Sequence, residues 1–265
     1  MTTISASLVK ELRDQTGAGM MDVKRALVET DGDLEAARRL LRERGMATAA
    51  KRADRTTSEG EVLVTISGGT GTIVAVGCET EPVSKNEEFL AFAEQALEAV
   101  EEGGEGALEA LDAERQELIG RLGENVVVVG AARLEALEGE SLAEYVHPPA
   151  NKIGVLVRVR GDDPVEARRV AMHISFSNPR YLTRQNVPEE DVAAEREIYA
   201  NSDEVLAKPE NVRDKIVDGM LQKRFYADTV LAEQAWIHDT AKTVAQALAD
   251  AGLELLDFRR FSVAG

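Results

Sequence analysis

The sequence predicts an α+β protein, and three observations support this class. Apolar residues recur at helical spacing through the first 55 residues, and β-branched runs of alternating character follow them. An order of hairpin, helices and third strand then occurs twice. The 265-residue chain is 44% hydrophobic and 30% charged, as in a folded protein with one large domain or a few small ones. We therefore expect an N-terminal three-helix module and a core of two related α+β subdomains.

The N-terminal module is expected to span residues 1–46 and to contain three short helices. Gly17 ends the first apolar run as a left-handed C-terminal residue does, and a second run begins at Met20. Asp33 can cap the third helix, which Gly45 is expected to end. A bundle of this size is marginally stable alone, so we expect it to pack against the rest of the chain or against a partner.

Residues 47–59 have the composition of a linker, because they are small, polar and basic. Residues 1–55 contain 11 Lys and Arg against 9 Asp and Glu, whereas the remaining 210 residues contain 20 against 39. The net charge is therefore +2 in the first segment and −19 in the rest, a difference that is typical of a separate module.

The first core subdomain is expected to span residues 60–140. The glycine-rich sequence 68–71 separates two β-branched runs and predicts a β-hairpin, and Asn86 can cap the helix that follows. The predicted elements are strands at residues 61–67 and 72–79, a helix from Asn86, a helix near residues 108–122 and a strand at residues 125–137.

The second core subdomain is expected to combine residues 141–180 with residues 228–265, because the same order of elements recurs there. Its predicted elements are strands at residues 142–147 and 153–160, a helix from Pro164, a helix over residues 240–252 and a strand at residues 253–263. The two units resemble an internal duplication, although their residues match only weakly.

Residues 181–227 interrupt the second subdomain and predict a helical hairpin. Pro188 can start one amphipathic helix, the Lys208-Pro209 pair ends it, and a second amphipathic helix follows. The apolar residues expected to face inward are Val192, Ile198, Tyr199, Val205, Leu206, Val212, Ile216, Met220 and Leu221. Two short helices joined at a proline indicate an antiparallel pair that either protrudes from the core or packs against a second copy.

Composition excludes several classes of function. The formal net charge of −17 and the pI of about 4.7 argue against nucleic acid as the main partner. No leader pattern and no apolar stretch of about 18 residues occurs, so we expect a cytosolic protein without a membrane partner. One cysteine and three widely spaced histidines exclude a structural zinc site, and we expect no cofactor.

Candidate catalytic groups are few. The glycine-rich sequence 68–71 lacks the Lys-Ser/Thr of a phosphate-binding loop and is better explained as a turn. Cys78 can be a nucleophile, although it lies at a strand position where a buried residue is expected. The pair Glu79 and Glu81 carries little information in a chain with 48 acidic residues. His147, which precedes two prolines, is either a turn residue or a functional one.

The segment from Cys78 to Asn86 needs a further explanation. A strand leads through Pro82 into a helix cap, and a loop held in this way can present side chains to a partner. A plain strand-to-helix connection is the alternative. Met20 and Met21 pose the same choice, since methionine near a helix start either fills a core or forms a contact surface.

Four segments carry a resemblance to a known family. They are residues 8–27 (LVKELRDQTGAGMMDVKRAL), 78–89 (CETEPVSKNEEF), 123–128 (GENVVV) and 145–157 (YVHPPANKIGVLV). In this order they resemble the N-terminal, core, third-strand and second-subdomain signatures of elongation factor Ts. Members of that family are guanine-nucleotide exchange factors for the translational GTPase elongation factor Tu. The similarity extends almost to Gly265.

The resemblance implies a module similar to ubiquitin-associated domains, an inserted hairpin for coiled-coil or homodimer contacts, and elongation factor Tu as the partner. It implies that Mg²⁺ is displaced from that GTPase, without a cofactor or covalent chemistry, by Thr80, Glu81, Pro82 and Val83. The other contacts that it implies are Leu12, Met20, Met21, Lys24, Gly123, His147, Ile237 and His238. The family usually has Asp and Phe where this chain has Glu81 and Pro82, which predicts a weaker wedge and slower exchange.

Two alternatives from other classes stay open. The three-helix segment can be a binding module for peptides or ubiquitin-like surfaces, in which case residues 1–55 bind alone. An enzyme that uses Cys78 as its nucleophile would lose its activity on Cys78→Ala substitution.

Overall fold

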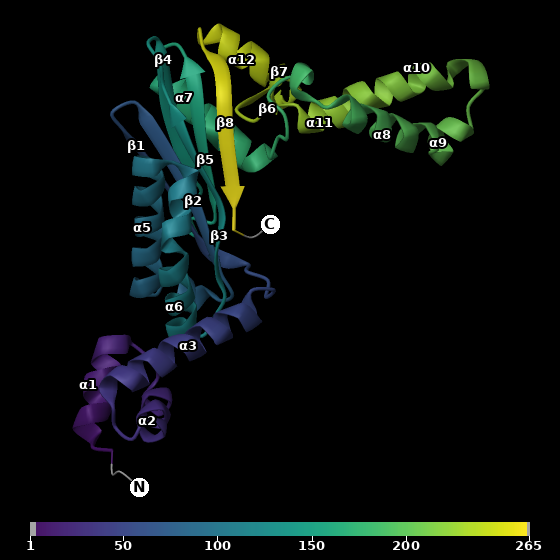
Figure 1. Ribbon diagram of the computed structural model, residues 1–265. Helices are drawn as coiled ribbons and strands as arrows, with labels where there is room; N and C mark the ends of the chain where they lie inside the picture. Colours follow the sequence, from purple (N-terminus) through teal and green to yellow (C-terminus); the bar gives the residue numbers. More distant parts are fainter. Residues whose placement is uncertain (1–3, 264–265) are drawn as a thin grey trace.

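The computed structural model describes residues 4–263, so the predicted outer boundaries at residues 1 and 265 lie outside the described part. The structure confirms the α+β class, with a three-helix module, a core of two three-stranded sheets and a helical arm. Figure 1 shows the module (purple) at one end of the core and the arm (green) extending from its side. The arm is defined here as residues 181–230.

Three helices form the N-terminal module, and capping residues mark the end of the first and the start of the third. They are α1 (Ala6–Thr16), α2 (Met20–Glu29) and α3 (Leu34–Arg52). Gly17 ends α1 with a φ of 65°, as predicted, and Asp33 caps α3 by accepting a hydrogen bond from the Ala36 N–H at 3.0 Å. The module core consists of Leu12, Val23, Ala26, Leu27 and Ala37.

The end of α3 differs from the prediction, since this helix passes Gly45 and continues to Arg52. Gly45 lies where α3 crosses α6 (Asp112–Leu122): a Cβ atom added to Gly120 of α6 would be 2.9 Å from the Gly45 Cα atom. The close approach of the two helices therefore needs glycine at position 120, and Gly45 lies at this crossing rather than at a helix end. The predicted linker over residues 47–59 is therefore helical in its first part, and α3 connects the module to the core as one continuous element.

The first subdomain is an antiparallel sheet covered by helices. Its strands, in spatial order, are β1 (Glu59–Ser67), β2 (Thr70–Cys78) and β3 (Val126–Glu135). Its helices are α4 (Glu81–Ser84), α5 (Glu87–Gly103), the 3₁₀ helix η1 (Glu105–Leu111) and α6. Asn86 caps α5, as predicted, and Gly68 and Gly69 form the turn of the β1–β2 hairpin with positive φ angles.

The second subdomain repeats this topology. Its sheet, in spatial order, consists of β4 (Glu140–Val146), β5 (Ile153–Arg160) and β8 (Glu254–Ser262), with α7 (Pro164–Ser177) and α12 (Val244–Asp250) as its helices. A short hairpin of β6 (Ala235–Trp236) and β7 (Asp239–Thr243) adds to the predicted elements. The helix predicted over residues 240–252 consequently begins only at Val244, where Thr243 and Gln246 form a capping box.

The two sheets pack face to face, and this contact requires glycine on both of them. A Cβ atom at Gly130 of β3 would lie 2.5 Å from the Phe261 ring of β8, and one at Gly154 of β5 would overlap Val62 of β1. The strand β2 is buried on both faces, by α5 on one side and by the second sheet on the other, so its exposure does not alternate. The core therefore has its helices outside and its two sheets inside.

The arm is more broken than the predicted pair of helices. Its helical segments are η2 (Arg184–Asn186), α8 (Glu189–Ala200), α9 (Asp203–Leu206), α10 (Glu210–Met220), the π-helical turn η3 (Leu221–Tyr226) and α11 (Ala227–Thr229). Because α8 ends at Ala200, well before Lys208-Pro209, the predicted apolar stripe is interrupted. Three residues predicted to face inward are exposed as a result: Ile198, Leu206 and Val212.

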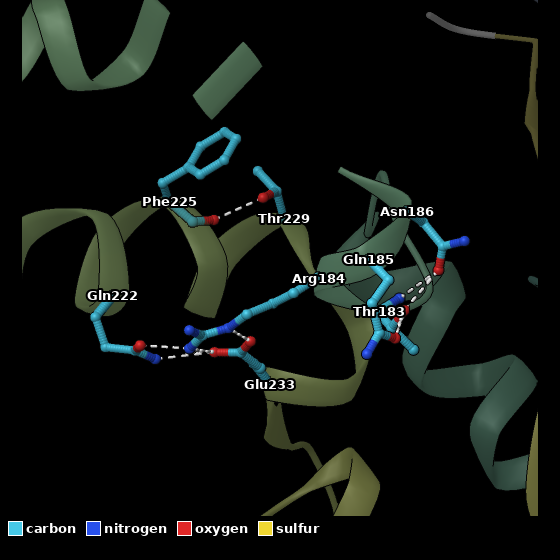
Figure 2. Close-up of polar contacts among 8 residues, drawn as sticks. All are labelled: Thr183, Arg184, Gln185, Asn186, Gln222, Phe225, Thr229 and Glu233. Carbon is cyan, nitrogen blue, oxygen red and sulfur yellow. Dashed lines mark hydrogen bonds and ion pairs between the residues drawn. The ribbon is translucent and has the colours of Figure 1, made fainter. Parts of the chain in front are cut away.

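A polar cluster closes the base of the arm (Figure 2). The Arg184 guanidinium pairs with the Glu233 carboxylate, with Nη2 and Oε2 2.6 Å apart, and lies 4.4 Å from the centre of the Tyr226 ring. Gln222 donates a hydrogen bond to the same carboxylate at 2.9 Å. The hydrogen bond from Arg184 holds the pKa of Glu233 below its usual value. Arg184 and Glu233 lie on the two segments that enter and leave the arm, so their pair joins these segments.

Candidate partner-binding site

The predicted contact segment, residues 80–83, forms a single helical turn after β2. Thr80 precedes α4, and Glu81 and Pro82 are its first residues. Pro82 suits this position because it has no N–H to satisfy and its φ is fixed near the helical value. Thr80, Glu81 and Pro82 are exposed, whereas Val83 is half-buried against the helical side of the first subdomain. The segment therefore presents a short, stiff surface, which is called the Thr80 turn below.

A second loop lies directly beside this turn. Gly123 ends α6 with a φ of 74°, a left-handed conformation that glycine adopts without strain. The Glu124 carboxylate then accepts a hydrogen bond from the Thr80 N–H at 3.0 Å, and the Asn125 N–H donates to the Glu79 carboxylate at 2.7 Å. Neither Glu124 nor Asn125 is among the predicted site residues. The only sequence signal for them was their place after Gly123 in GENVVV.

The Glu79 carboxylate forms ion pairs and a hydrogen bond within the chain. It lies 3.1 Å from the Arg55 guanidinium and 3.7 Å from that of Arg52, the last residue of α3. Burial alone would raise the pKa of Glu79, but the hydrogen bond from Asn125 and the Arg55 ion pair outweigh burial and lower this pKa below 4.5. Glu79 thus fastens the end of α3 and the following segment to the end of β2.

Cys78 is buried, in agreement with its strand position. Its thiol donates a hydrogen bond to the Thr80 carbonyl oxygen at 3.4 Å. Burial, and next the charge of Glu124, raise the pKa of Cys78 to about 12. The thiol is therefore protonated near neutral pH, which counts against the hypothesis of a cysteine nucleophile.

The N-terminal module exposes two methionines and a lysine. Met20 is 57% exposed and Met21 is 64% exposed at the start of α2, so both form a surface instead of filling the core. Lys24 is exposed on the same helix. Leu12 is fully buried between the module helices, which contradicts its predicted role as a direct contact. Its helical spacing reflects the module core instead.

A cleft of about 800 Å³ lies between the module and α6. Gly19, next to Met20, and Gly123 both line it, so the cleft connects the module surface with the loop beside the Thr80 turn. Its guanidinium groups are those of Arg25, Arg38, Arg42, Arg44, Arg52 and Arg121. These groups have carboxylate partners, as Arg42 has in Glu117 at 3.0 Å. The cleft is therefore a polar groove in which the charges are largely compensated.

His147 lies at the same end of the core as the Thr80 turn. It is exposed after β4, and its Nδ1 atom is 3.1 Å from the Tyr145 hydroxyl oxygen. The loop that follows is bound to the start of β1, where the Val62 N–H donates to the Asn151 carbonyl oxygen at 2.7 Å. Because β1 starts beside the end of β2, this strand links the His147 loop with the Thr80 turn.

Ile237 and His238 lie elsewhere, on the β6–β7 hairpin (Figure 1). The buried His173 of α7 accepts a hydrogen bond from the Ile237 N–H at Nδ1, 3.4 Å away, and therefore donates from Nε2 to Gln234 at 2.9 Å. Burial lowers the pKa of His173, so the ring is neutral at neutral pH. Trp236 stacks on His173 and contacts the His238 ring. The exposed predicted residues thus lie in three places, which are the module surface, the Thr80 turn with its neighbouring loops, and the β6–β7 hairpin.

Two kinds of feature are absent from residues 4–263. No helix in this range combines the length and the apolar character that a membrane span requires. No group of three His, Cys, Asp or Glu side chains in this range is placed to hold a metal ion.

The fold combines a three-helix module, a core of two packed sheets and a helical arm, and its exposed turns are of a kind that suits contact with another protein. A family model described as "Elongation factor TS" matches residues 79–265, which is more than half of the chain. The chain belongs to the elongation factor Ts family, a family of translation elongation factors.

Individual relatives agree over almost the whole sequence. The chain is 39% identical to elongation factor Ts of Leifsonia xyli and 40% identical to that of Clavibacter michiganensis, with 99% of both chains covered in each case. It is 41% identical to elongation factor Ts of Thioalkalivibrio sulfidiphilus, over 98% of this chain and 92% of the relative. The similarity therefore includes the N-terminal module, which the family model does not reach.

Proposed function

We propose that this chain is a guanine-nucleotide exchange factor that binds elongation factor Tu, both GDP-bound and nucleotide-free, in the cytoplasm. On binding, the Thr80 turn displaces Mg²⁺ and shifts the phosphate loop of the GTPase, so that GDP leaves and GTP can bind. The observation that carries the proposal is the exposed, stiff turn at the segment where the family resemblance places Mg²⁺ displacement. The mechanism requires no covalent step and no cofactor.

Further surfaces are proposed to bind the same GTPase. They are Met20, Met21 and Lys24 on the module, Gly123 and His147 near the Thr80 turn, and Ile237 and His238 on the β6–β7 hairpin. Leu12 is not among them, because its burial lets it support the module only from within.

Exchange of this kind is a coupling between two binding equilibria. A GTPase holds GDP largely through its phosphate loop and Mg²⁺, so a protein that displaces the metal lowers the affinity for GDP. By linkage, GDP lowers the affinity for the factor to the same extent, and GTP can then expel the factor. Each 1.4 kcal/mol or so of differential binding changes the nucleotide affinity about tenfold.

The proposal is tested by mixing the chain with elongation factor Tu that is loaded with fluorescent GDP. Substoichiometric amounts are expected to accelerate GDP release, because each molecule can act repeatedly. A release rate that stays at its spontaneous value up to saturating concentrations contradicts the proposal. The same assay separates exchange from the binding-module alternative, in which the module binds its ligand but leaves GDP release unchanged.

Pro82 provides a more specific prediction. A proline ring buries much less apolar area than a phenylalanine ring, so we expect Pro82→Phe to accelerate GDP release by about tenfold through a larger wedge in the GTPase. The measurement is stopped-flow release of fluorescent GDP. Pro82→Ala is the control, since it removes the fixed φ without adding a ring. An unchanged rate of GDP release in Pro82→Phe would contradict the prediction that proline at this position makes a weaker wedge than phenylalanine.

A homodimer through the arm stays a separate prediction of the family resemblance. The exposed Ile198, Leu206 and Val212 are the apolar side chains that such contacts can bury. Sedimentation equilibrium of the intact chain distinguishes a monomer from a dimer.

A further inference from the structure

Thr80 is exposed, yet its polar groups are bound within the chain. Its N–H and its hydroxyl donate to the two carboxylate oxygens of Glu124, at 3.0 Å and 2.6 Å. Its carbonyl oxygen accepts hydrogen bonds from the Ser84 N–H at 3.2 Å and from the Cys78 thiol at 3.4 Å. Water can satisfy such groups at a surface, so these bonds are not needed to compensate burial. Their effect is to fix the conformation of Thr80.

The Thr80 hydroxyl, which donates to Glu124, also does not play the helix-capping role that is usual for a threonine at this position. A threonine before a helix usually caps it, because the hydroxyl oxygen accepts a hydrogen bond from an N–H of the first turn. Thr80 makes no such bond with α4. Since α4 has only four residues, its own backbone hydrogen bonds stabilise it little. The Thr80 turn therefore depends on contacts from outside the helix.

Glu124 is held in place from both sides. Before it, Gly123 fixes the chain in the left-handed conformation that ends α6. After it, the buried Asn125 donates its backbone N–H to Glu79 and its side-chain amide to the Arg55 carbonyl oxygen, the latter at 2.9 Å. The backbone that carries the Glu124 side chain is thus fixed on both sides, unlike that of most glutamates in surface loops.

We infer that Glu124 is a positioning residue, which holds the Thr80 turn in its binding conformation before the partner arrives. The inference rests on the proposed function, because it states what keeps that site in shape for the GTPase. A site that is only partly in its competent conformation binds with an apparent dissociation constant that is raised by the inverse of the competent fraction. Glu124 consequently sets the concentration of this chain that half-saturates GDP release. The rate of GDP release within the assembled complex is set by the Thr80 turn itself.

The test compares Glu124→Ala with Glu114→Ala. Glu114 is exposed on the same helix that leads to Gly123, and its replacement removes the same charge. We expect Glu124→Ala to raise the half-saturating concentration in GDP release about tenfold, because two hydrogen bonds to a charged group are lost. The maximal rate at saturation is expected to stay within about twofold of the original. Glu114→Ala is expected to change neither quantity.

Two further variants separate positioning from a general loss of structure. Glu124→Gln keeps one acceptor oxygen, so its half-saturating concentration should lie between those of the original chain and Glu124→Ala. Thr80→Val, which removes only the hydroxyl, should raise this concentration in the original chain but not in the Glu124→Ala background. Equal effects of Thr80→Val in both backgrounds contradict the inference.

Amide hydrogen exchange of residues 80–86 in the free protein gives a readout without the partner. These amides should exchange faster in Glu124→Ala than in Glu114→Ala, while both variants unfold at similar denaturant concentrations. The inference is overturned if the amide hydrogen-exchange rates of the turn are the same in Glu124→Ala as in Glu114→Ala. It is also overturned if Glu124→Ala lowers the maximal rate of GDP release while these hydrogen-exchange rates stay unchanged. If the original chain does not accelerate GDP release, the proposed function fails, but hydrogen exchange still decides whether Glu124 holds the turn.

Discussion

The N-terminal module and the arm project from one core, but they are attached to it by different means. The module is joined by the continuous helix α3, which crosses α6 at Gly45 and Gly120. A second close contact lies nearby, where a Cβ atom at Gly17 would be 2.6 Å from the Arg121 side chain. The arm is joined by two chain segments, which are paired by backbone hydrogen bonds such as that from the Leu231 N–H to the Tyr181 carbonyl oxygen at 2.9 Å, and by a cluster of charged and polar groups around Arg184.

This difference shows which force fixes each orientation. The contact between Gly45 and Gly120 depends on shape, so it is insensitive to salt but does not tolerate a methyl group added at Gly120. An exposed ion pair depends on charge, contributes little free energy and is screened by salt. We therefore expect the orientation of the module to be fixed sterically, and that of the arm to depend on ionic strength.

The largest effect is expected from Gly120→Ala. The added Cβ atom would be 2.9 Å from the Gly45 Cα atom, so the two helices must move apart, at a cost of about 1–3 kcal/mol in the free energy of unfolding. Gly45→Ala should be tolerated, because its Cβ atom would be 3.8 Å from the Gly120 Cα atom, an ordinary contact. Denaturant unfolding and hydrogen exchange of α3 and α6 measure both outcomes.

Gly219→Ala is the matched control for these two variants, since Gly219 is a helical glycine whose added Cβ atom would have nothing within 4 Å. It is expected to stabilise α10 by about 0.5–1 kcal/mol. Equal effects of Gly120→Ala and Gly219→Ala would show that the helix crossing does not fix the module.

A smaller, pH-dependent effect is expected from Glu79→Gln at a charged contact of the module attachment. Glu79 pairs with Arg52 and Arg55, and its folded-state pKa lies below 4.5. Its stabilisation is therefore complete above pH 4.5 and is lost as the pH falls through the folded-state pKa. We expect Glu79→Gln to lower the free energy of unfolding by about 1–2 kcal/mol at neutral pH, and the difference from the original chain to vanish in acid.

Unfolding at a series of pH values measures this difference, with the exposed Glu81 providing the control variant Glu81→Gln. A deficit of Glu79→Gln that stays constant with pH would indicate lost packing instead of a lost charge.

The smallest effect is expected from Arg184→Ala at the arm base. Arg184 is 46% exposed, so its pair with Glu233 should contribute less than about 1 kcal/mol. The distances between arm and core should nevertheless spread somewhat, because the Arg184 pair adds to the backbone hydrogen bonds between the two connecting segments, such as that from the Leu231 N–H to the Tyr181 carbonyl oxygen at 2.9 Å. Spin labels on the exposed positions Leu137→Cys and Leu206→Cys measure them, since the one native cysteine is buried.

Arg196→Ala is the control for Arg184→Ala. Arg196 is equally exposed, but both Arg196 and its partner Asp218 lie within the arm. A distance distribution that is as narrow in Arg184→Ala as in Arg196→Ala would contradict a polar attachment. High salt should broaden the distribution of the original chain in the same direction as Arg184→Ala.

Local signals predicted most of the fold. Asp33, Asn86 and Gly17 act at helix ends through bonds with their immediate neighbours, which sequence spacing alone can reveal. The misjudged features depend on distant residues. Gly45 was predicted to end a helix, but it lies inside α3 at the contact with Gly120, which is 75 positions further along the chain. Similarly, β7 replaced the start of a predicted helix because it pairs with β6.

The candidate site was predictable only in part, for a related reason. The exposed turn from Thr80 to Val83 could be predicted through Pro82, whose stiffness is a local property, whereas its contact role rests on the family resemblance. Leu12 was assigned to a surface, although helical spacing cannot tell a core residue from a contact residue. The role of Glu124 could not be predicted from the sequence, because its hydrogen bonds to Thr80 span 44 positions. A glutamate between a helix and a strand also has no characteristic sequence pattern.

The packed sheets have a consequence for any protein that binds both ends of the core. The glycine contacts between β3 and β8, and between β5 and β1, leave no room for one sheet to slide over the other. We therefore expect the span from Thr80 to His238 to keep nearly the same length. A molecule that holds both positions at once must adapt its own dimensions to this length, and the resulting distortion falls on that molecule alone.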